Sequence, residues 1–213
     1  MGEWSMRHRI DSGLDVATWR TAVVLLAMCA ASAFVAPVAA NVPAPHEVVS
    51  AVIGRVMERL ETLDGGSAAP DHAVLEVFEQ ELTPHLDFAT ITRWMSGPRW
   101  EAFSEDERAD LTGAIRAHIV QVYSSLLAHG RDVAIDVQPN STLRKRSAKV
   151  PAMLATADGR SFQVEFRLLQ NADTWRLYDL VVDGVSFARA LQSEIGPVIA
   201  AQGVHGVKAY LAR

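Results

Sequence analysis

Cysteine is almost absent from this sequence of 213 residues, which contains only Cys29. A disulfide framework and a zinc site built from several cysteines both need multiple thiols at defined spacing, so both are excluded. A basic excess is also missing, because 25 acidic residues outnumber 20 basic ones and give a formal net charge of -5. Nucleic-acid binders normally show the opposite balance, so we expect no nucleic-acid partner.

The sequence motifs of common enzyme classes are missing as well. The chain has no G-x-S-x-G, H-E-x-x-H, P-loop or G-x-G-x-x-G pattern. These motifs therefore give no reason to expect an enzyme, a metal or a cofactor. One alternative is a small cone-fold enzyme with Asp179 as its base, because this acid interrupts an apolar segment. A capping or strand-end hydrogen bond accounts for Asp179 more simply.

The first forty residues differ from the rest of the chain. Arg7, Arg9 and Arg20 precede an uncharged stretch, residues 21–40, which ends in small residues. This pattern is typical of a secretory signal, and we expect cleavage after Ala40. The alternative is an uncleaved membrane anchor, since the stretch is long enough to span a bilayer if it tilts. The prediction is an exported single domain, residues 41–213.

Helical periodicity dominates the first part of this domain. Apolar residues recur every three or four positions in residues 46–64, in a segment that begins at Asp71, and in residues 87–95. Ser104 and Glu107 form a capping-box pattern that opens the longest predicted helix, to about residue 128. A further helix is expected from about Arg189, or from about Ser193 because Gly196-Pro197 interrupts the pattern.

The period changes from 3.6 to 2 after Gly130, which indicates strands. They are predicted over residues 133–138, 149–156, 161–169 and 174–182, with a hairpin at Asp158-Gly159. Helices followed by an antiparallel meander predict an α+β fold, in which the N-terminal helices and the C-terminal helix pack over a four-stranded antiparallel sheet.

Several motifs follow one another in a distinctive order from about Val48 to the end. They are Leu82-x-x-x-Leu86-Asp87-Phe88, Gly97-x-x-Trp100, Trp175-Arg176-Leu177-Tyr178-Asp179-Leu180, Asp183-Gly184-Val185-Ser186 and Gly203-Val204-x-Gly206. With these motifs the chain resembles the MlaC-type toluene-tolerance family of periplasmic phospholipid-binding proteins, which are auxiliary to an ABC transporter.

This resemblance implies a carrier with an apolar cavity between its helices and its sheet, where acyl chains insert. The implied partners are an inner-membrane ABC transporter with its MCE-domain ring and an outer-membrane lipoprotein complex, and the implied location is the periplasm. A hopanoid or another polycyclic lipid is the alternative cargo, as in the hopanoid-associated branch of the family.

The apolar faces of the predicted elements supply candidates for the cavity wall. From the long helix and the sheet they are Ile115, Ile119, Val122, Ile135, Val137, Met153, Val164, Phe166 and Val181. The alternative is that these side chains close into a dry core, as most apolar faces do.

A basic cluster lies between the first two predicted strands. It consists of Arg144, Lys145 and Arg146. We expect a docking site for a partner complex at this cluster, and the alternative is a solvated loop, because runs of charge are usually just solvated.

Overall fold

The computed structural model describes residues 42–63, 71–129 and 133–211. The predicted signal segment, residues 1–40, lies outside these residues, as do the predicted helix ends at Gly65-Gly66 and Gly130. None of the helices formed by the described residues combines the length and the hydropathy that a bilayer crossing needs.

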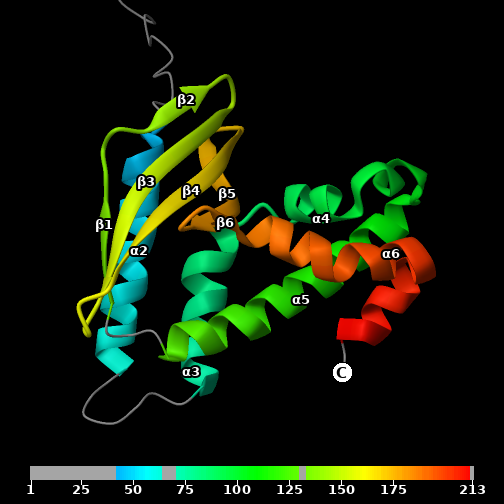
Figure 1. The fold of residues 1–213 in the computed structure, drawn as a ribbon, viewed down its shortest axis with the longest axis horizontal. Helices are drawn as coiled ribbons and strands as arrows, with labels where there is room; N and C mark the ends of the chain where they lie inside the picture. The colour runs from blue at the N-terminus through cyan, green and yellow to red at the C-terminus, as the bar shows by residue number, and fades with distance from the viewer. Residues whose placement is uncertain (1–41, 64–70, 130–132, 212–213) are drawn as a thin grey trace, which may run out of the picture. The chain divides into compact units, whose positions relative to one another are not determined.

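Helices and short helical turns form the first half of the described chain (Figure 1). In order they are α2 (Pro45–Leu63), α3 (Asp71–Val77), the π-helical turn η1 (Phe78–Leu82), the 3-10 turn η2 (Thr83–His85), α4 (Phe88–Ser96), the 3-10 segment η3 (Gly97–Ala102) and α5 (Glu105–His129). The predicted capping box opens α5. The Ser104 hydroxyl accepts from the Glu107 backbone N–H at 3.2 Å, and the Glu107 carboxylate accepts from the Ser104 N–H at 2.9 Å.

An antiparallel sheet follows the helices. Its strands are β1 (Val133–Val137), β2 (Thr142–Arg144), β3 (Ser147–Thr156), β4 (Ser161–Asn171), β5 (Thr174–Val182) and β6 (Val185–Ser186). Their order is β1-β3-β4-β5-β6, and β2 pairs with β3. The α+β prediction is confirmed, but the sheet has six strands instead of four. The additional strands, β2 and β6, have only three and two residues, too few to show an alternating pattern.

A β-bulge interrupts the pairing of β4 with β5. Arg167 lies opposite Asp179, but Leu168 lies opposite Leu177, so Tyr178 is an extra residue on β5. Residues directly opposite each other share a face of the sheet. Val181 lies opposite Glu165 and therefore on the other face from Phe166. Val181, a predicted cavity residue like Phe166, therefore lies on the opposite face, because the extra residue Tyr178 shifts the alternation along β5.

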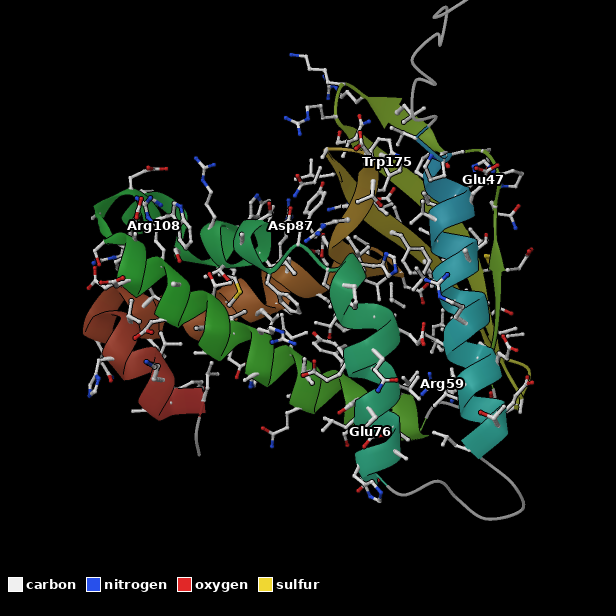
Figure 2. The ribbon with its side chains drawn as sticks, turned by 180° about the vertical axis from the view of Figure 1, so that it is seen from behind. Glu47, Arg59, Glu76, Asp87, Arg108 and Trp175 are labelled. Carbon is white, nitrogen blue, oxygen red and sulfur yellow. The ribbon has the colours of Figure 1, made fainter. Side chains whose placement is uncertain are left out.

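Helix α2 packs on one part of the sheet and forms a closed core with it (Figure 2). The Trp175 indole N–H donates to the carbonyl oxygen of Pro43 at 3.1 Å, which fixes the beginning of α2 to β5. The buried members of this core come from α2 and three strands: Val49, Ala148, Val150, Leu168 and Trp175.

Helices α4, α5 and α6 (Phe187–Leu211) pack together beside the sheet (Figure 1). Their shared core includes Met95, Ile115 and Ile195. Helix α6 begins at Phe187, not near Arg189 or Ser193 as expected, and it contains Pro197. Gly203 divides it at a kink, where a φ of 63° places the residue in the left-handed region that favours glycine.

Candidate functional site

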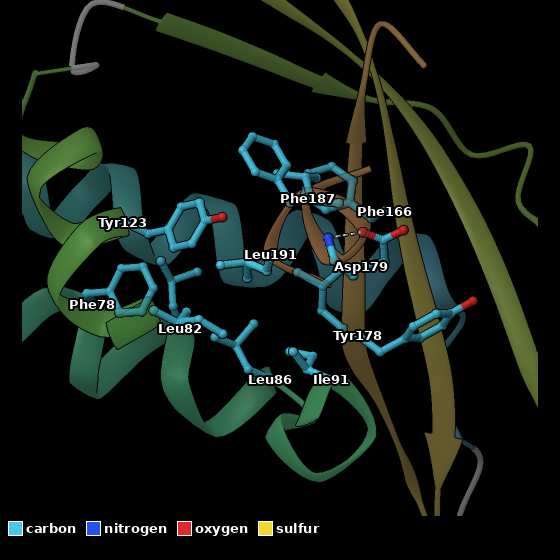
Figure 3. A pocket seen from close by; sticks show the side chains of 14 residues that line it. Phe78, Leu82, Leu86, Ile91, Tyr123, Phe166, Tyr178, Asp179, Phe187 and Leu191 are labelled. Atoms are coloured by element: carbon cyan, nitrogen blue, oxygen red, sulfur yellow. Dashed lines mark hydrogen bonds between the residues drawn. The ribbon is translucent and has the colours of Figure 1, made fainter. Parts of the chain in front are cut away.

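An apolar cavity of about 210 Å³ lies between the helices and the sheet (Figure 3). Asp179 is the one charged residue among the fourteen that line it. The others come from η1, α4, α5, α6, β4, β5 and the connection after η2: Phe78, Leu82, Leu86, Ile91, Ile119, Tyr123, Phe166, Leu177, Tyr178, Leu180, Phe187, Ala188 and Leu191.

The cavity is intermediate in size. A dry apolar cavity of ~150 Å³ admits benzene, whereas pockets for larger ligands measure roughly 300–1,000 Å³. At about 210 Å³ the cavity holds part of a hydrocarbon chain. A larger apolar ligand therefore requires the helices and the sheet to move apart.

The short turns between α3 and α4 build one wall of the cavity. The π-helical turn η1 contributes Phe78 and Leu82, and Leu86 follows η2. Leu86 forms an isolated parallel bridge with Leu177, and the Asp87 N–H donates to the Leu177 carbonyl oxygen at 2.8 Å. This wall is thereby joined to β5 by backbone contacts at a single short segment.

Two aromatic rings form another part of the wall. Tyr123 of α5 and Phe187 of α6 meet edge to face, with ring centroids 5.6 Å apart (Figure 3). Burial raises the pKa of the Tyr123 hydroxyl, and the nearby Glu194 and Asp179 carboxylates raise it further. Tyr123 therefore stays neutral at physiological pH, as an apolar lining requires.

Asp179 is fully engaged in structural contacts. Its Oδ1 accepts from the Ala188 N–H at 3.0 Å, and its Oδ2 accepts from the Ser186 hydroxyl at 2.8 Å and from Arg167 Nη1 at 3.1 Å. The Ser186 hydroxyl in turn accepts from the Arg189 N–H, which caps the first turn of α6. The expected capping role of Asp179 is confirmed.

Comparison with known proteins identifies the family of this chain. A family model described as "MlaC protein" matches residues 50–213. The chain belongs to the MlaC family. This assignment confirms the resemblance drawn from the sequence and supports a binding protein instead of an enzyme.

The same fold is found in a solved structure of the phospholipid-binding protein from Ralstonia solanacearum in complex with a phospholipid. The TM-score is 0.68 at 18% sequence identity, and the match covers 80% of this chain and 96% of that chain. At this level of identity the likeness establishes the shared MlaC-type fold.

Two of the nine residues predicted to line an MlaC-type cavity lie in its wall: Ile119 of α5 and Phe166 of β4. Ile115, one turn before Ile119, is 0% exposed in the core that α4, α5 and α6 share. Ile119 belongs to the same core, but only Ile119 also lines the cavity. Val122 and Met153 are each 39% exposed and lie outside the wall. The apolar stripe of α5 thus contributes to the helical core and to the cavity wall, and periodicity alone does not distinguish the residues of one from those of the other.

The four remaining predicted residues also lie outside the cavity wall. Val137 packs against the closed core beneath α2, and Val164 is buried between its cross-strand neighbours Ala152 and Val182. Ile135 lies on β1 at the sheet edge, and Val181 lies on the face of Glu165. The cavity lies over the β5 bulge, next to the turns η1 and η2.

The sequence contained a usable signal for the residues that were missed. Leu82 and Leu86 stand in the first of the ordered family motifs, and Leu177 to Leu180 stand in the third. Their place in the wall depends on the π-helical turn and on the bulge, neither of which has a sequence pattern as regular as that of a helix or a strand.

The basic cluster forms a tight turn between β2 and β3, in place of the longer loop that was predicted. Arg144 lies opposite Ser147, and Lys145 has a φ of 55°. All three side chains are exposed, and Arg146 Nη2 donates to the Gln170 carbonyl oxygen at 2.8 Å. Partner docking at this turn stays a prediction.

A polar cluster joins the outer side of the η1–η2 wall to α2. Arg55 and Arg59 of α2 pair with the Glu81 carboxylate at 3.1 and 3.3 Å, and Arg55 Nη2 lies 3.1 Å from His85 Nε2. An arginine can only donate, so His85 Nε2 accepts and its ring is neutral. Burial lowers the pKa of His85, and the Arg55 and Arg176 charges lower it further.

Acidification is expected to destabilise the folded protein through His85. Its folded pKa lies below the unfolded value of about 6.5, so the unfolded chain binds the proton first as pH falls. The contribution of His85 to stability is present above about pH 6.5 and is lost as pH falls towards the folded pKa. His85→Gln, which keeps an acceptor for Arg55, should reduce the dependence of the melting temperature on pH between 7.5 and 5.5. An unchanged pH dependence would contradict this role.

Asp179→Asn is expected to destabilise the fold by about 2 kcal/mol, since it weakens the cap of α6 and a charge-assisted hydrogen bond to Arg167. Denaturant unfolding measures the loss. Glu105→Asn is a control, because Glu105 is exposed in the first turn of α5. Equal stability of the Asp179→Asn variant and the unmodified protein would contradict the capping role.

Among residues 42–63, 71–129 and 133–211, no group of three or more His, Cys, Asp or Glu side chains is placed to hold a metal ion. The cavity is lined by apolar side chains, and the Asp179 carboxylate is already bound by Arg167, Ser186 and Ala188.

Proposed function

We propose that this chain is a periplasmic lipid carrier that shields the acyl chains of a phospholipid in the cavity between η1, α5, α6 and β5. The observation that carries this proposal is an apolar cavity whose single charged residue is neutralised by Arg167 and by hydrogen bonds from Ser186 and Ala188. The phospholipid in the Ralstonia solanacearum structure of the same fold supports it.

The energetics of lipid transfer require such a container. Moving a two-chain lipid into water exposes roughly thirty methylenes at ~0.8 kcal/mol each, a cost on the order of 20 kcal/mol. Unaided crossing of an aqueous compartment is therefore negligible. A soluble carrier must hide the chains and release them only at a membrane complex.

The wall of the cavity suits movement between closed and open states. The η1–η2 segment is a π-helical turn followed by a 3-10 turn, and π-helical turns are often found at functional sites. On the sheet side this segment is held by the Leu86–Leu177 bridge and the Asp87 hydrogen bond, and on the α2 side by partly exposed ion pairs. We infer that this segment moves when the cavity fills.

Extraction of the purified mature protein with organic solvent, followed by mass spectrometry, tests the proposal. About one phospholipid per chain is the expected result. One hopanoid per chain would identify a different cargo and leave the proposed carrier function unchanged. A protein that carries no lipid after expression and takes none from phospholipid vesicles would overturn the proposal.

We further propose that the carrier exchanges lipid with an inner-membrane ABC transporter complex with its MCE-domain ring and with an outer-membrane lipoprotein complex, and that the basic turn is a docking contact. The variant Arg144→Glu/Lys145→Glu leaves Arg146 and its bond to Gln170 intact. We expect unchanged bound lipid and about tenfold slower transfer to acceptor complexes at low salt, a difference that shrinks as salt screens the charges. Transfer at the unmodified rate in low salt would identify the turn as an ordinary solvated connection.

A further inference from the structure

A second hollow, of about 700 Å³, lies next to the apolar cavity. Four elements contribute to both. Thr90 of α4 lines the hollow and the next residue, Ile91, lines the cavity. In the same way, Gln192 of α6 and Leu169 of β4 line the hollow, whereas Leu191 and Phe166 line the cavity. Tyr178 of β5 lines both. We call this hollow the polar groove. A ligand that fills the cavity and extends past Tyr178 enters the polar groove.

The β5 bulge positions Tyr178 at this boundary. As the extra residue on β5, Tyr178 departs from the alternation of its neighbours, and Figure 3 shows its ring directed away from Leu82, Leu86 and Leu191. Bulges commonly redirect a side chain next to a functional site. Burial raises the pKa of the Tyr178 hydroxyl, so it remains protonated and can donate a hydrogen bond.

The polar groove differs from the cavity in its chemistry. Its lining includes one cation and one anion, Arg93 of α4 and Glu101 of η3, whose side chains pair at 3.1 Å. Their exposed fractions are 67% and 68%. An ion pair this exposed contributes only about 0–1 kcal/mol, so a ligand that carries both charges can replace it at little cost.

An aromatic side chain lies beside these charges. Trp94 is 42% exposed and lines the groove, and its carbonyl oxygen accepts from Gln192 Nε2 at 3.0 Å, which holds α4 and α6 together there. The face of a tryptophan ring attracts ammonium and quaternary ammonium groups. A cation, an anion and an exposed indole together match a ligand with a phosphate and an ammonium group.

We propose that the polar groove binds the zwitterionic head group of the lipid whose acyl chains occupy the cavity, with Arg93 on the phosphate and Glu101 and Trp94 on the ammonium group. The cargo is then a phospholipid of the phosphoethanolamine or phosphocholine class. An anionic head group such as phosphoglycerol brings no cation to Glu101, which then keeps only its longer pair with Arg108 at 3.8 Å, so this head group is bound less well. This inference rests on the proposed carrier function.

Competitive loading tests the inference. The protein is incubated with vesicles of equal parts phosphatidylethanolamine and phosphatidylglycerol, reisolated and extracted, and the ratio of the two bound lipids is measured. We expect the unmodified protein to favour phosphatidylethanolamine by about threefold, as for an exposed ionic contact. Glu101→Gln should bring the ratio close to one. Arg93→Gln should reduce loading of both lipids by about threefold.

The control variant is Glu105→Gln, because Glu105 is an exposed acid outside the groove. It should keep the ratio of the unmodified protein. Ratios and loading that are the same in all four proteins would overturn the head-group assignment while the carrier function stands. Absence of any bound lipid in the unmodified protein would overturn both.

Discussion

Replacing Ile119 by tryptophan is expected to reduce the affinity for phospholipid by about 10- to 100-fold while the folded structure is retained. Ile119 faces the cavity, so a larger side chain occupies space that is open in the unfilled protein. An acyl chain must then displace the indole or overpack the wall, at a cost of ~1–3 kcal/mol, and each ~1.4 kcal/mol is a factor of ten in affinity. Lipid bound after vesicle loading and denaturant unfolding are the two measurements.

Ile115 provides a matched control, since it is the same residue type one turn earlier on α5 but 0% exposed in the closed core. Ile115→Trp should overpack this core and lower the free energy of unfolding by about 1–3 kcal/mol or more. We thus expect Ile119→Trp to reduce lipid loading and Ile115→Trp to reduce the free energy of unfolding. If Ile119→Trp lowers stability as much as Ile115→Trp and leaves lipid loading unchanged, Ile119 is not a cargo contact.

A disulfide between the helical wall and β5 is expected to trap bound lipid. Leu86 and Leu177 are bridge partners that both line the cavity, so their Cα atoms are close enough for a crosslink between cysteines. In the variant Leu86→Cys/Leu177→Cys the wall cannot leave the sheet. A crosslink that adds ~3 kcal/mol to the barrier to release slows transfer by on the order of 100-fold.

The measurement is transfer of fluorescent phospholipid from the loaded variant to acceptor vesicles, before and after addition of a reductant. The rate should recover on reduction. A control crosslink joins two strands of the sheet, through Ala155→Cys/Ser161→Cys, because these residues pair in the β3–β4 hairpin. Reduction of the control should leave transfer unchanged. Equal transfer by the oxidised and reduced Leu86→Cys/Leu177→Cys protein would show that release takes another route.

Local sequence signals predicted most of the elements of the fold. The capping box at Ser104 and Glu107, the alternation along β3 and β4 and the Asp158-Gly159 hairpin are each encoded within a few residues, and all are present in the structure. Such signals depend on backbone geometry and on which face is buried, both of which are local properties.

The start of α6 depends on contacts that are distant in the sequence. Asp179 of β5 accepts from the Ala188 N–H and the Ser186 hydroxyl, so the helix begins earlier than its own residues indicate. The residues that form the cavity wall are likewise determined by contacts that are distant in the sequence. Both Ile115 and Ile119 lie in the core of α4, α5 and α6. Which of them also borders the cavity depends on tertiary packing, so periodicity does not distinguish them.

Crosslinking with a phospholipid that carries a photoreactive group at the end of an acyl chain tests most directly whether the chains occupy this cavity. The purified protein is loaded with this lipid, irradiated and digested, and the modified residues are identified by mass spectrometry. We expect modification at Phe166 and within residues 78–91, 119–123 and 177–191, where the wall residues of η1, α4, α5, β4, β5 and α6 lie. Crosslinks confined to exposed residues outside these segments would contradict it.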